Sequence, residues 1–141
     1  MSKRSRQPSF AKDPDWLLSD GESSGAELPV LRGGGVRRGD ILIGAADTAG
    51  LSKDGFRLRT MPGGTLGISS GGGNGLVYGV VTLLERCLGM NYYAADVYDL
   101  DRLATIVLPA MDVREIPAFR YRQSQAYGMA QDPVYRLFLR L

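Results

Sequence analysis

The chain has 141 residues, of which 44% are hydrophobic and 9% aromatic, so it can bury a single hydrophobic core and one domain is the default expectation. Its 17 basic and 15 acidic residues leave a net charge of +2, which is too balanced to indicate nucleic acid or an anionic membrane as a partner. The lack of histidine rules out Ser-His-Asp and Cys-His catalysis and imidazole-bound zinc in this chain acting alone, and the single cysteine rules out an internal disulfide.

The N-terminal residues 1–38 are polar and rich in proline and glycine, and we expect a poorly ordered segment or a reduced first strand and helix region. Within it, residues 16–18 favour a short helix and residues 28–31 a small strand. The basic start has no apolar segment behind it, so the sequence predicts no secretory signal there. No apolar run in the chain approaches the roughly 20 residues of a membrane-spanning helix.

Residues 39–110 predict an α+β unit. The short apolar run Ile41–Ala45 is typical of a central strand covered on both faces. Apolar residues then alternate with polar or small ones on both sides of a Met-Pro-Gly-Gly turn, which predicts a β-hairpin with one buried face. That face would consist of Phe56, Leu58, Leu66 and Ile68.

A helix after the glycine-rich elbow Gly71–Gly75 is the best-determined element of the sequence. Asn74 is the expected N-cap, and Gly89 the expected left-handed stop. The apolar residues recur at helical spacing and must be buried, with a second, weaker apolar edge that predicts contact with a sheet on one side and other protein on another. Because Cys87 lies on the main stripe, we expect an inert core thiol rather than a nucleophile. The stripe consists of Leu76, Val80, Leu83, Leu84, Cys87 and Leu88.

Several shorter elements follow the helix. Residues 91–95 are strand-like, residues 104–108 predict another strand, and residues 112–122 alternate in an extended pattern. The segment Asp132–Leu141 opens with Asp-Pro, an N-cap followed by proline at the first helical position, and predicts an amphipathic helix. A strand followed by the first turns of such a helix is typical of the start of a further βα domain. The apolar face of this helix would consist of Val134, Leu137, Phe138 and Leu141.

Two glycine motifs have both a chemical and a packing interpretation. Gly67–Gly71 fits G-x-S-x-G, but its serine has no histidine base and the helix begins several residues too late for a nucleophile elbow. A G-x-G-x-x-x-G pattern begins at Gly73, and Asp96 follows about 20 residues later, as in dinucleotide-binding folds. The preceding hairpin and the short chain argue against that fold. A small nucleotide- or phosphate-binding domain that uses the Gly71–Gly75 elbow is therefore the runner-up, and the simpler interpretation is that these glycines let the helix pack tightly after the sheet.

Two other groups of residues are candidate binding sites. Asp96, Asp99 and Asp101 share a loop, but it lacks the glycine and the closing glutamate of a calcium loop, so a solvated acidic loop is expected. A free-standing carbohydrate-binding module would need exposed aromatic residues. The candidates for that role are Tyr92, Tyr93 and Tyr98.

Five segments occur in a recognisable order over about residues 39–141: GDILIGAAD, DGFRLRT, LGISSGGGNGLVYGVVTLLERCLGMNYYAAD, IVLP and IPAFRYR. This order resembles the non-catalytic N-terminal domain of β-N-acetylhexosaminidases, α-glucuronidases and related bacterial proteins, and the helix start at Tyr78-Gly79 is the most specific part of the resemblance. The chain departs from the pattern at Asn74, where those families usually have arginine. It also has only a reduced version of their first strand and long helix in residues 1–38.

The resemblance implies an α+β domain with a zincin-like mixed sheet and no zinc centre, packed beside a (β/α)₈ barrel. Residues 111–141 would begin that barrel as a truncated domain, and the segment Pro117–Arg122 would form its first strand. In hexosaminidase-like members the arginine that matches Arg122 holds hydroxyls of the terminal sugar, so the resemblance implies a substrate-binding role for Arg122. A planar, permanently charged guanidinium suits a pair of sugar oxygens. The other interpretation of Arg122 is a surface ion-pair partner.

We therefore expect a non-catalytic accessory domain of a glycoside hydrolase, which supports a downstream catalytic barrel that acts on a glycan. The chain alone is expected to be inactive, without catalytic residues, cofactor or metal, because the catalytic acids would lie beyond Leu141. Neither nucleic acid nor a membrane is an expected partner. The resembled families are commonly exported, to the periplasm or outside the cell.

Overall fold

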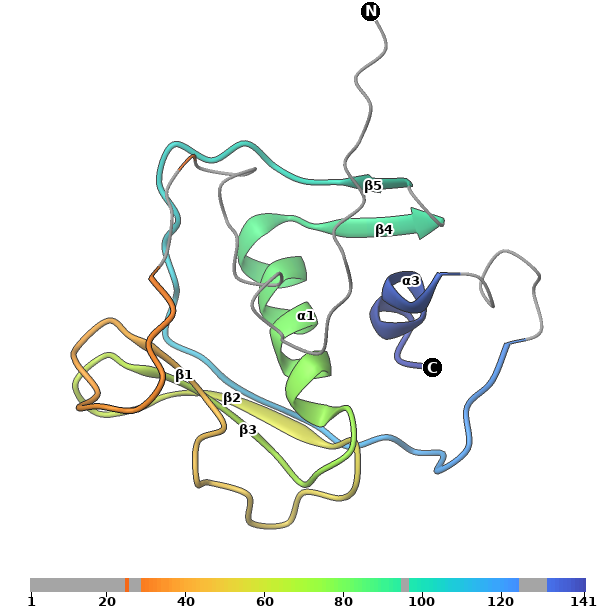
Figure 1. Ribbon diagram of the computed structural model, residues 1–141, viewed down its shortest axis with the longest axis horizontal. Helices are drawn as coiled ribbons and strands as arrows, with labels where there is room; N and C mark the ends of the chain where they lie inside the picture. The colour runs from red at the N-terminus through yellow and green to blue at the C-terminus, as the bar shows by residue number, and fades with distance from the viewer. Residues whose placement is uncertain (1–24, 26–28, 95–96, 125–131) are drawn as a thin grey trace, which may run out of the picture.

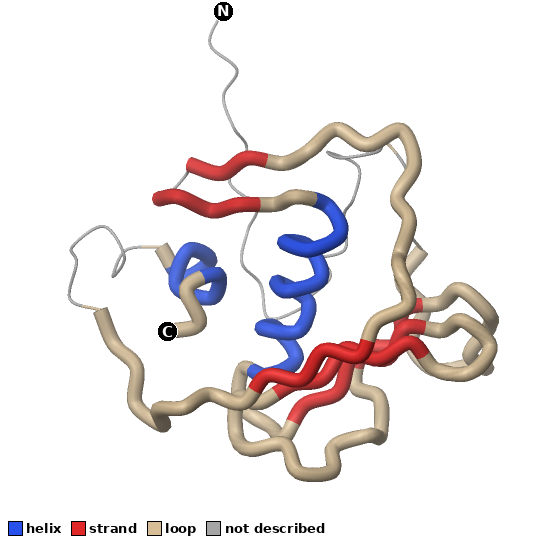
Figure 2. Tube along the Cα trace, turned by 180° about the vertical axis from the view of Figure 1, so that it is seen from behind, coloured by secondary structure: helices blue, strands red, loops and turns tan. Residues whose placement is uncertain are grey.

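The computed structural model describes residue 25 and residues 29–94, 97–124 and 132–141 of the chain. Over these residues the fold is α+β, as expected, with a mixed four-stranded sheet, a two-stranded antiparallel sheet and two helices. Both helices lie on the same side of the four-stranded sheet, and α1 rises from it toward the β4–β5 hairpin (Figures 1 and 2). The elements in chain order are β1 (Ile41–Ile43), β2 (Phe56–Thr60), β3 (Leu66–Ser70), α1 (Gly75–Leu88), β4 (Asn91–Ala94), β5 (Val97–Asp99), β6 (Asp112–Glu115) and α3 (Pro133–Phe138).

The predicted hairpin is confirmed as β2 and β3 at the centre of the four-stranded sheet. The strand order is β1-β3-β2-β6, with β1 parallel to β3 and β2 antiparallel to both β3 and β6. Leu58 lies opposite Ile68, and both side chains are fully buried. The alternation that the sequence shows therefore gives the sheet one apolar face, which packs under α1.

The prediction of a central strand at Ile41–Ala45 is wrong. β1 covers only Ile41–Ile43, stands at one end of the strand order, and all three of its residues are half-buried. Ile41 and Ile43 pack against the core, whereas Leu42 pairs with Gly67 and shares its outward side. A short apolar run does not by itself distinguish a central strand from an edge strand whose one face is buried.

Helix α1 has the extent that its spacing predicts, and its end is confirmed at Gly89. The φ of Gly89 is +64°, in the left-handed region, and its amide donates to the carbonyl of Leu84. The helix is buried more widely than the predicted stripe, because Tyr78, Val81 and Thr82 are also buried. It packs on β2 and β3 on one side and on α3 on another, which confirms the expected two-sided burial. Leu76 and Cys87, at the margin of the stripe, are half-buried.

The predicted strand at residues 104–108 is absent from the structure. This segment is irregular, with Val107 73% exposed, while Ile106 and Leu108 still pack against the core. These two apolar side chains are therefore partly buried although their segment forms no strand. A high β-propensity gives a strand only where a neighbouring strand lies beside it.

Other local predictions meet mixed outcomes. Asp99 was expected in a loop but ends β5, because residues 97–99 pair with β4. Residues 29–31 form no strand. The short helix predicted at 16–18 and the acid Asp96 lie outside the described residues.

β6 adds the segment after residue 111 to the same sheet. Val113 lies opposite Leu58, but the strand ends at Glu115, so only the first part of the extended pattern predicted for residues 112–122 is paired. This strand joins elements of the predicted accessory unit, 39–110, to the predicted start of the barrel.

α3 packs against α1 and completes the core. Its predicted N-cap is confirmed, because the Asp132 carboxylate accepts hydrogen bonds from the amides of Val134 and Tyr135 and proline follows it. Val134 and Phe138 are 6% and 5% exposed and belong to the same apolar cluster as α1. The helix ends at Phe138, before the predicted Leu141.

Candidate functional site

Arg122, the predicted substrate-binding residue, points into the protein and makes three polar contacts and one ring contact there. Its Nε donates to the carbonyl of Arg140 at 2.8 Å and its Nη1 to the carbonyl of Phe119 at 2.9 Å. Its Nη2 lies 3.4 Å from Oδ2 of Asp54, and the guanidinium carbon is 5.9 Å from the centre of the Tyr78 ring. The side chain is only 21% exposed. Through its contacts with Asp54 and Tyr78, Arg122 connects the chain around residue 120 to the start of α1.

Asp54 connects Arg122 to the N-terminus of α1. Its Oδ1 accepts a hydrogen bond of 2.7 Å from the amide of Asn74, while Oδ2 faces Arg122. A carboxylate at this position interacts favourably with the positive end of the helix dipole. Asp54 adopts a φ of +65°, in the left-handed region, which aspartate tolerates better than most residues.

The predicted N-cap position of Asn74 is confirmed, but the side-chain hydrogen bond typical of such a cap is absent. Asn74 occupies the N-cap position, but its side chain accepts no capping hydrogen bond, and its Nδ2 instead lies 3.4 Å from the hydroxyl of Tyr78. Asp54, from a loop distant in sequence, accepts a hydrogen bond from the amide of Asn74 itself. The Tyr78 hydroxyl also lies 3.4 Å from the carbonyl of Leu141, so this polar cluster joins the helix start to the end of the described chain.

The glycine elbow packs tightly against the loop before β2. A Cβ at Gly71 would collide with the carbonyl of Ser52, one at Gly73 with the Asp54 carboxylate, and one at Gly75 would lie 2.5 Å from the carbonyl of Gly55. The structure therefore supports the packing interpretation of these glycines. A phosphate bound at the amide of Asn74 would have to displace the Asp54 carboxylate.

The first four residues of the G-x-S-x-G motif lie within β3. Ser69 belongs to β3 opposite Arg57 and is 2% exposed, whereas a nucleophile elbow places its serine on a sharp turn. The motif is therefore part of the sheet.

The aromatic residues named for carbohydrate binding divide into two groups. Tyr92 stacks on Tyr98 and Tyr135 with ring centres 5.5 and 5.8 Å apart, and its ring centre is 4.9 Å from that of Phe138. Tyr92 thus holds α3 against the β4–β5 hairpin. Tyr93 and Tyr98 are 61% and 45% exposed and stay accessible.

Neither the acids nor the cysteine forms a reactive centre in the part of the chain that the structure describes. Within these residues no group of three His, Cys, Asp or Glu side chains could hold a metal ion. Asp99 accepts a hydrogen bond from the amide of Leu100. Burial raises the pKa of the Cys87 thiol, although the positive charge of Arg86 partly opposes this shift, and a raised pKa lowers thiolate reactivity. Among the described helices none is long and apolar enough to cross a membrane.

An ion-paired layer on the outer face of the sheet was not predicted. Arg57 donates to both carboxylate oxygens of Asp112 at 2.7 Å, and Arg57 and Arg59 both reach Asp47, at 3.2 and 3.1 Å. The hydrogen bond between Arg57 and Asp112 lowers the pKa of Asp112 and raises that of Arg57. The alternation of the hairpin indicates that both arginines face outward, but nothing local to them identifies their partners, which lie up to 55 residues away.

Comparison with known proteins identifies no relative of this chain. The chain matches no protein-family model, no curated protein and no solved structure.

Proposed function

We propose that this chain is a non-catalytic accessory domain of a carbohydrate-active glycoside hydrolase and that it supports a downstream catalytic barrel. The proposal joins the resemblance in sequence to the mixed α+β fold. The single observation that carries it is a row of exposed apolar side chains on the segment after β6, where the resembled domains meet their barrel.

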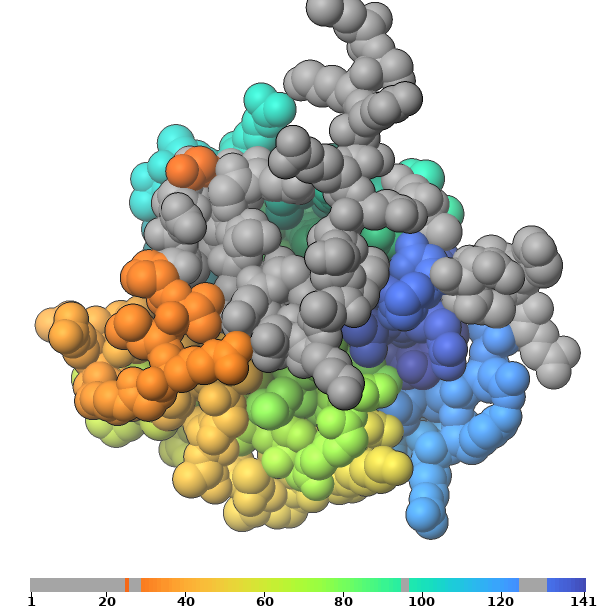
Figure 3. Space-filling view, viewed as in Figure 1, coloured from red at the N-terminus to blue at the C-terminus, as the bar shows by residue number. Residues whose placement is uncertain are grey.

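This apolar row consists of Ile116, Phe119 and Tyr121. Their exposed fractions are 44%, 73% and 78%, and the segment projects at the margin of the molecule (Figure 3, light blue). Large apolar side chains gathered on a protein surface mark contact with another protein surface. Arg122, next to the row, is turned inward to Asp54 and so fixes the segment that carries it. The proposed barrel would cover these exposed side chains.

The proposed substrate role of Arg122 requires a local change. Its hydrogen bonds to the two carbonyl groups are 2.8 and 2.9 Å long, while its contact with Asp54 is 3.4 Å. In the proposed enzyme a sugar hydroxyl would therefore compete first with Asp54. Nη2 of Arg122 could therefore contact either a sugar hydroxyl or Asp54, but not both at once.

The test is to read the coding sequence past Leu141 and to express the complete product. A product with a barrel of alternating strands and helices, a pair of carboxylates at strand ends, and hydrolysis of aryl glycosides supports the proposal. The purified 141-residue chain should hydrolyse no aryl glycoside. Hydrolysis by that chain alone, or a complete product without a barrel, would overturn it.

The apolar row gives a sharper test within the complete product. Phe119→Ser and Tyr121→Ser should loosen the joint to the barrel and increase cleavage by a protease between the two parts. Leu31→Ser is the matched control, because Leu31 is 77% exposed in a different part of the chain. Equal cleavage of all three variants would show that the row is ordinary solvent-exposed surface.

The runner-up, nucleotide or phosphate binding at Gly71–Gly75, needs a different probe. Gly75→Ala is unsuitable, since its Cβ would lie 2.5 Å from the carbonyl of Gly55 and would disturb the fold itself. Asp54→Gly removes the carboxylate that occupies the amide of Asn74 and leaves the elbow glycines unchanged. Saturable binding of NAD or NADP that tightens in Asp54→Gly would favour the runner-up, and no binding by either protein would remove it.

A further inference from the structure

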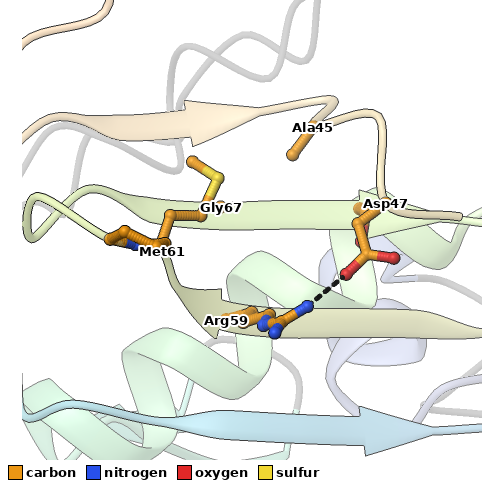
Figure 4. Close-up of a pocket in the computed structure, with 7 residues that line it drawn as sticks. Ala45, Asp47, Arg59, Met61 and Gly67 are labelled. Atoms are coloured by element: carbon orange, nitrogen blue, oxygen red, sulfur yellow. Dashed lines mark hydrogen bonds and ion pairs between the residues drawn. The ribbon is translucent and has the colours of Figure 1, made fainter.

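A pocket lies on the outer face of the four-stranded sheet, away from both helices and from Arg122. It encloses about 160 Å³ and opens to solvent (Figure 4). It includes Gly67 and Ser69 of the G-x-S-x-G motif and the ion pair of Asp47 with Arg59. Its lining residues are Ala45, Asp47, Arg59, Met61, Pro62, Gly67 and Ser69.

The inner wall of this outer-face pocket is largely apolar. The alternation of β3 turns Ile68 toward α1 and Gly67 toward the pocket. Gly67 adds no side chain, and a Cβ there would lie 3.2 Å from Cβ of Ala45 and 3.4 Å from Cε of Met61. Ala45 and Met61 therefore crowd the space directly over Gly67, and the apolar wall of the pocket consists of Ala45, Met61 and Pro62.

The mouth of the pocket carries one positive and one negative side chain side by side. Nη1 of Arg59 lies 3.1 Å from Oδ2 of Asp47, and the side chains are 50% and 39% exposed. The Nε of Arg59 is 4.0 Å from Asp112, beyond hydrogen-bond distance. Arg57, in contrast, uses Nε, Nη1 and Nη2 on two carboxylates. Arg59 therefore keeps donors that a ligand can use.

We propose that this pocket binds a free α-amino acid with a small aliphatic side chain, of about the size of valine. Its carboxylate would accept hydrogen bonds from Arg59, its ammonium group would face Asp47, and its side chain would lie against the apolar wall at Met61 and Pro62. Adjacent opposite charges on the protein match the adjacent opposite charges of a zwitterion, whereas a simple anion or cation would meet one like charge. A cavity of about 150 Å³ can hold a ligand of the size of benzene, so the pocket volume of about 160 Å³ suits a small ligand.

The test uses the whole chain, ¹⁵N-labelled, and follows backbone amide signals by NMR during titration with L-valine. We expect saturable shifts that centre on Ala45, Met61 and Gly67, with a dissociation constant in the millimolar range that a ligand of this size reaches. L-Valinamide, which lacks the carboxylate, and N-acetyl-L-valine, which lacks the ammonium group, should each bind about tenfold more weakly. These ligand comparisons use only the natural chain, so they remain valid even where a variant fails to fold.

Two variants complete the test. Arg59→Gln should weaken L-valine binding about tenfold, while Arg86→Gln should leave it unchanged. Arg86 is a matched control, because it lies on α1, is 55% exposed and has only a 3.8 Å ion pair with Glu115. The absence of saturable shifts, equal binding of the three ligands, or unchanged binding by a folded Arg59→Gln would each overturn the proposal.

Discussion

Replacement of Asp54 tests whether one carboxylate connects the helix start to Arg122. Asp54→Asn keeps an oxygen for the amide of Asn74 but removes the charge, which should cost about 1 kcal/mol from the lost dipole interaction and ion pair. Asp54→Ala also removes the acceptor, for a total of about 2 kcal/mol. Asp54→Gly should recover about 1 kcal/mol of that loss, because glycine adopts the observed φ of +65° without strain.

Urea unfolding measures these differences, and a double-mutant cycle isolates the ion pair. The Asp54→Asn and Arg122→Gln pair should show a coupling of about 0.5–1 kcal/mol, at the upper end for partly exposed pairs, since the two side chains are 19% and 21% exposed. The pair Arg86 and Glu115, 55% and 42% exposed, should show almost none. Losses below about 0.5 kcal/mol for all three Asp54 variants would refute this account, because ordinary surface substitutions give that much.

Two further outcomes follow from close packing and from charge. Gly79→Ala would place a Cβ 2.7 Å from Cγ2 of Ile68. The overpacking cost of about 1–3 kcal/mol should exceed the helix-propensity gain of about 1 kcal/mol, so urea unfolding should show a less stable protein. Gly35→Ala is the control and should be neutral, because its Cβ would lie in open space. A stabilised Gly79→Ala would show that the helix can shift away from the sheet. The lowered pKa of Asp112 means that its pair with Arg57 stabilises the fold fully above about pH 4 and that this contribution is lost as the pH falls through the lowered pKa. Urea midpoints of the natural chain and Asp112→Asn should therefore differ near neutral pH and converge in acid, and a pH-independent difference would contradict this.

Elements set by local pattern were predictable. The alternation around the Met-Pro-Gly-Gly turn identified the hairpin, the helical spacing after Gly75 identified α1, and Asp132 with its following proline identified the start of α3. Each signal lies within a few residues and acts through backbone geometry or one buried face. The strand predicted at residues 104–108 failed because a strand also needs a hydrogen-bonding partner, which the fold does not supply there.

The candidate sites depended more strongly on the tertiary structure. The sequence indicated that Arg122 could be functional, but not that its guanidinium turns inward to Asp54 and to the carbonyl of Arg140. It also indicated that Arg59 faces outward from the hairpin, but not that Asp47 meets it at the mouth of a pocket. Those contacts join loops that are distant in sequence and have no periodic signal of their own.

The sequence by itself determined the class of the fold, the helices α1 and α3 of the described residues, the central hairpin, and the exclusion of imidazole chemistry. Only the tertiary structure decided that the Ile41–Ile43 strand lies at one end of the strand order, that Asp54 accepts from the amide of Asn74 at the start of α1, and that the elbow glycines pack against a loop. The physical reason is range: periodicity and capping are encoded within one or two turns of chain, whereas ion pairs, close backbone approaches and strand order depend on which distant segments the shared core brings together.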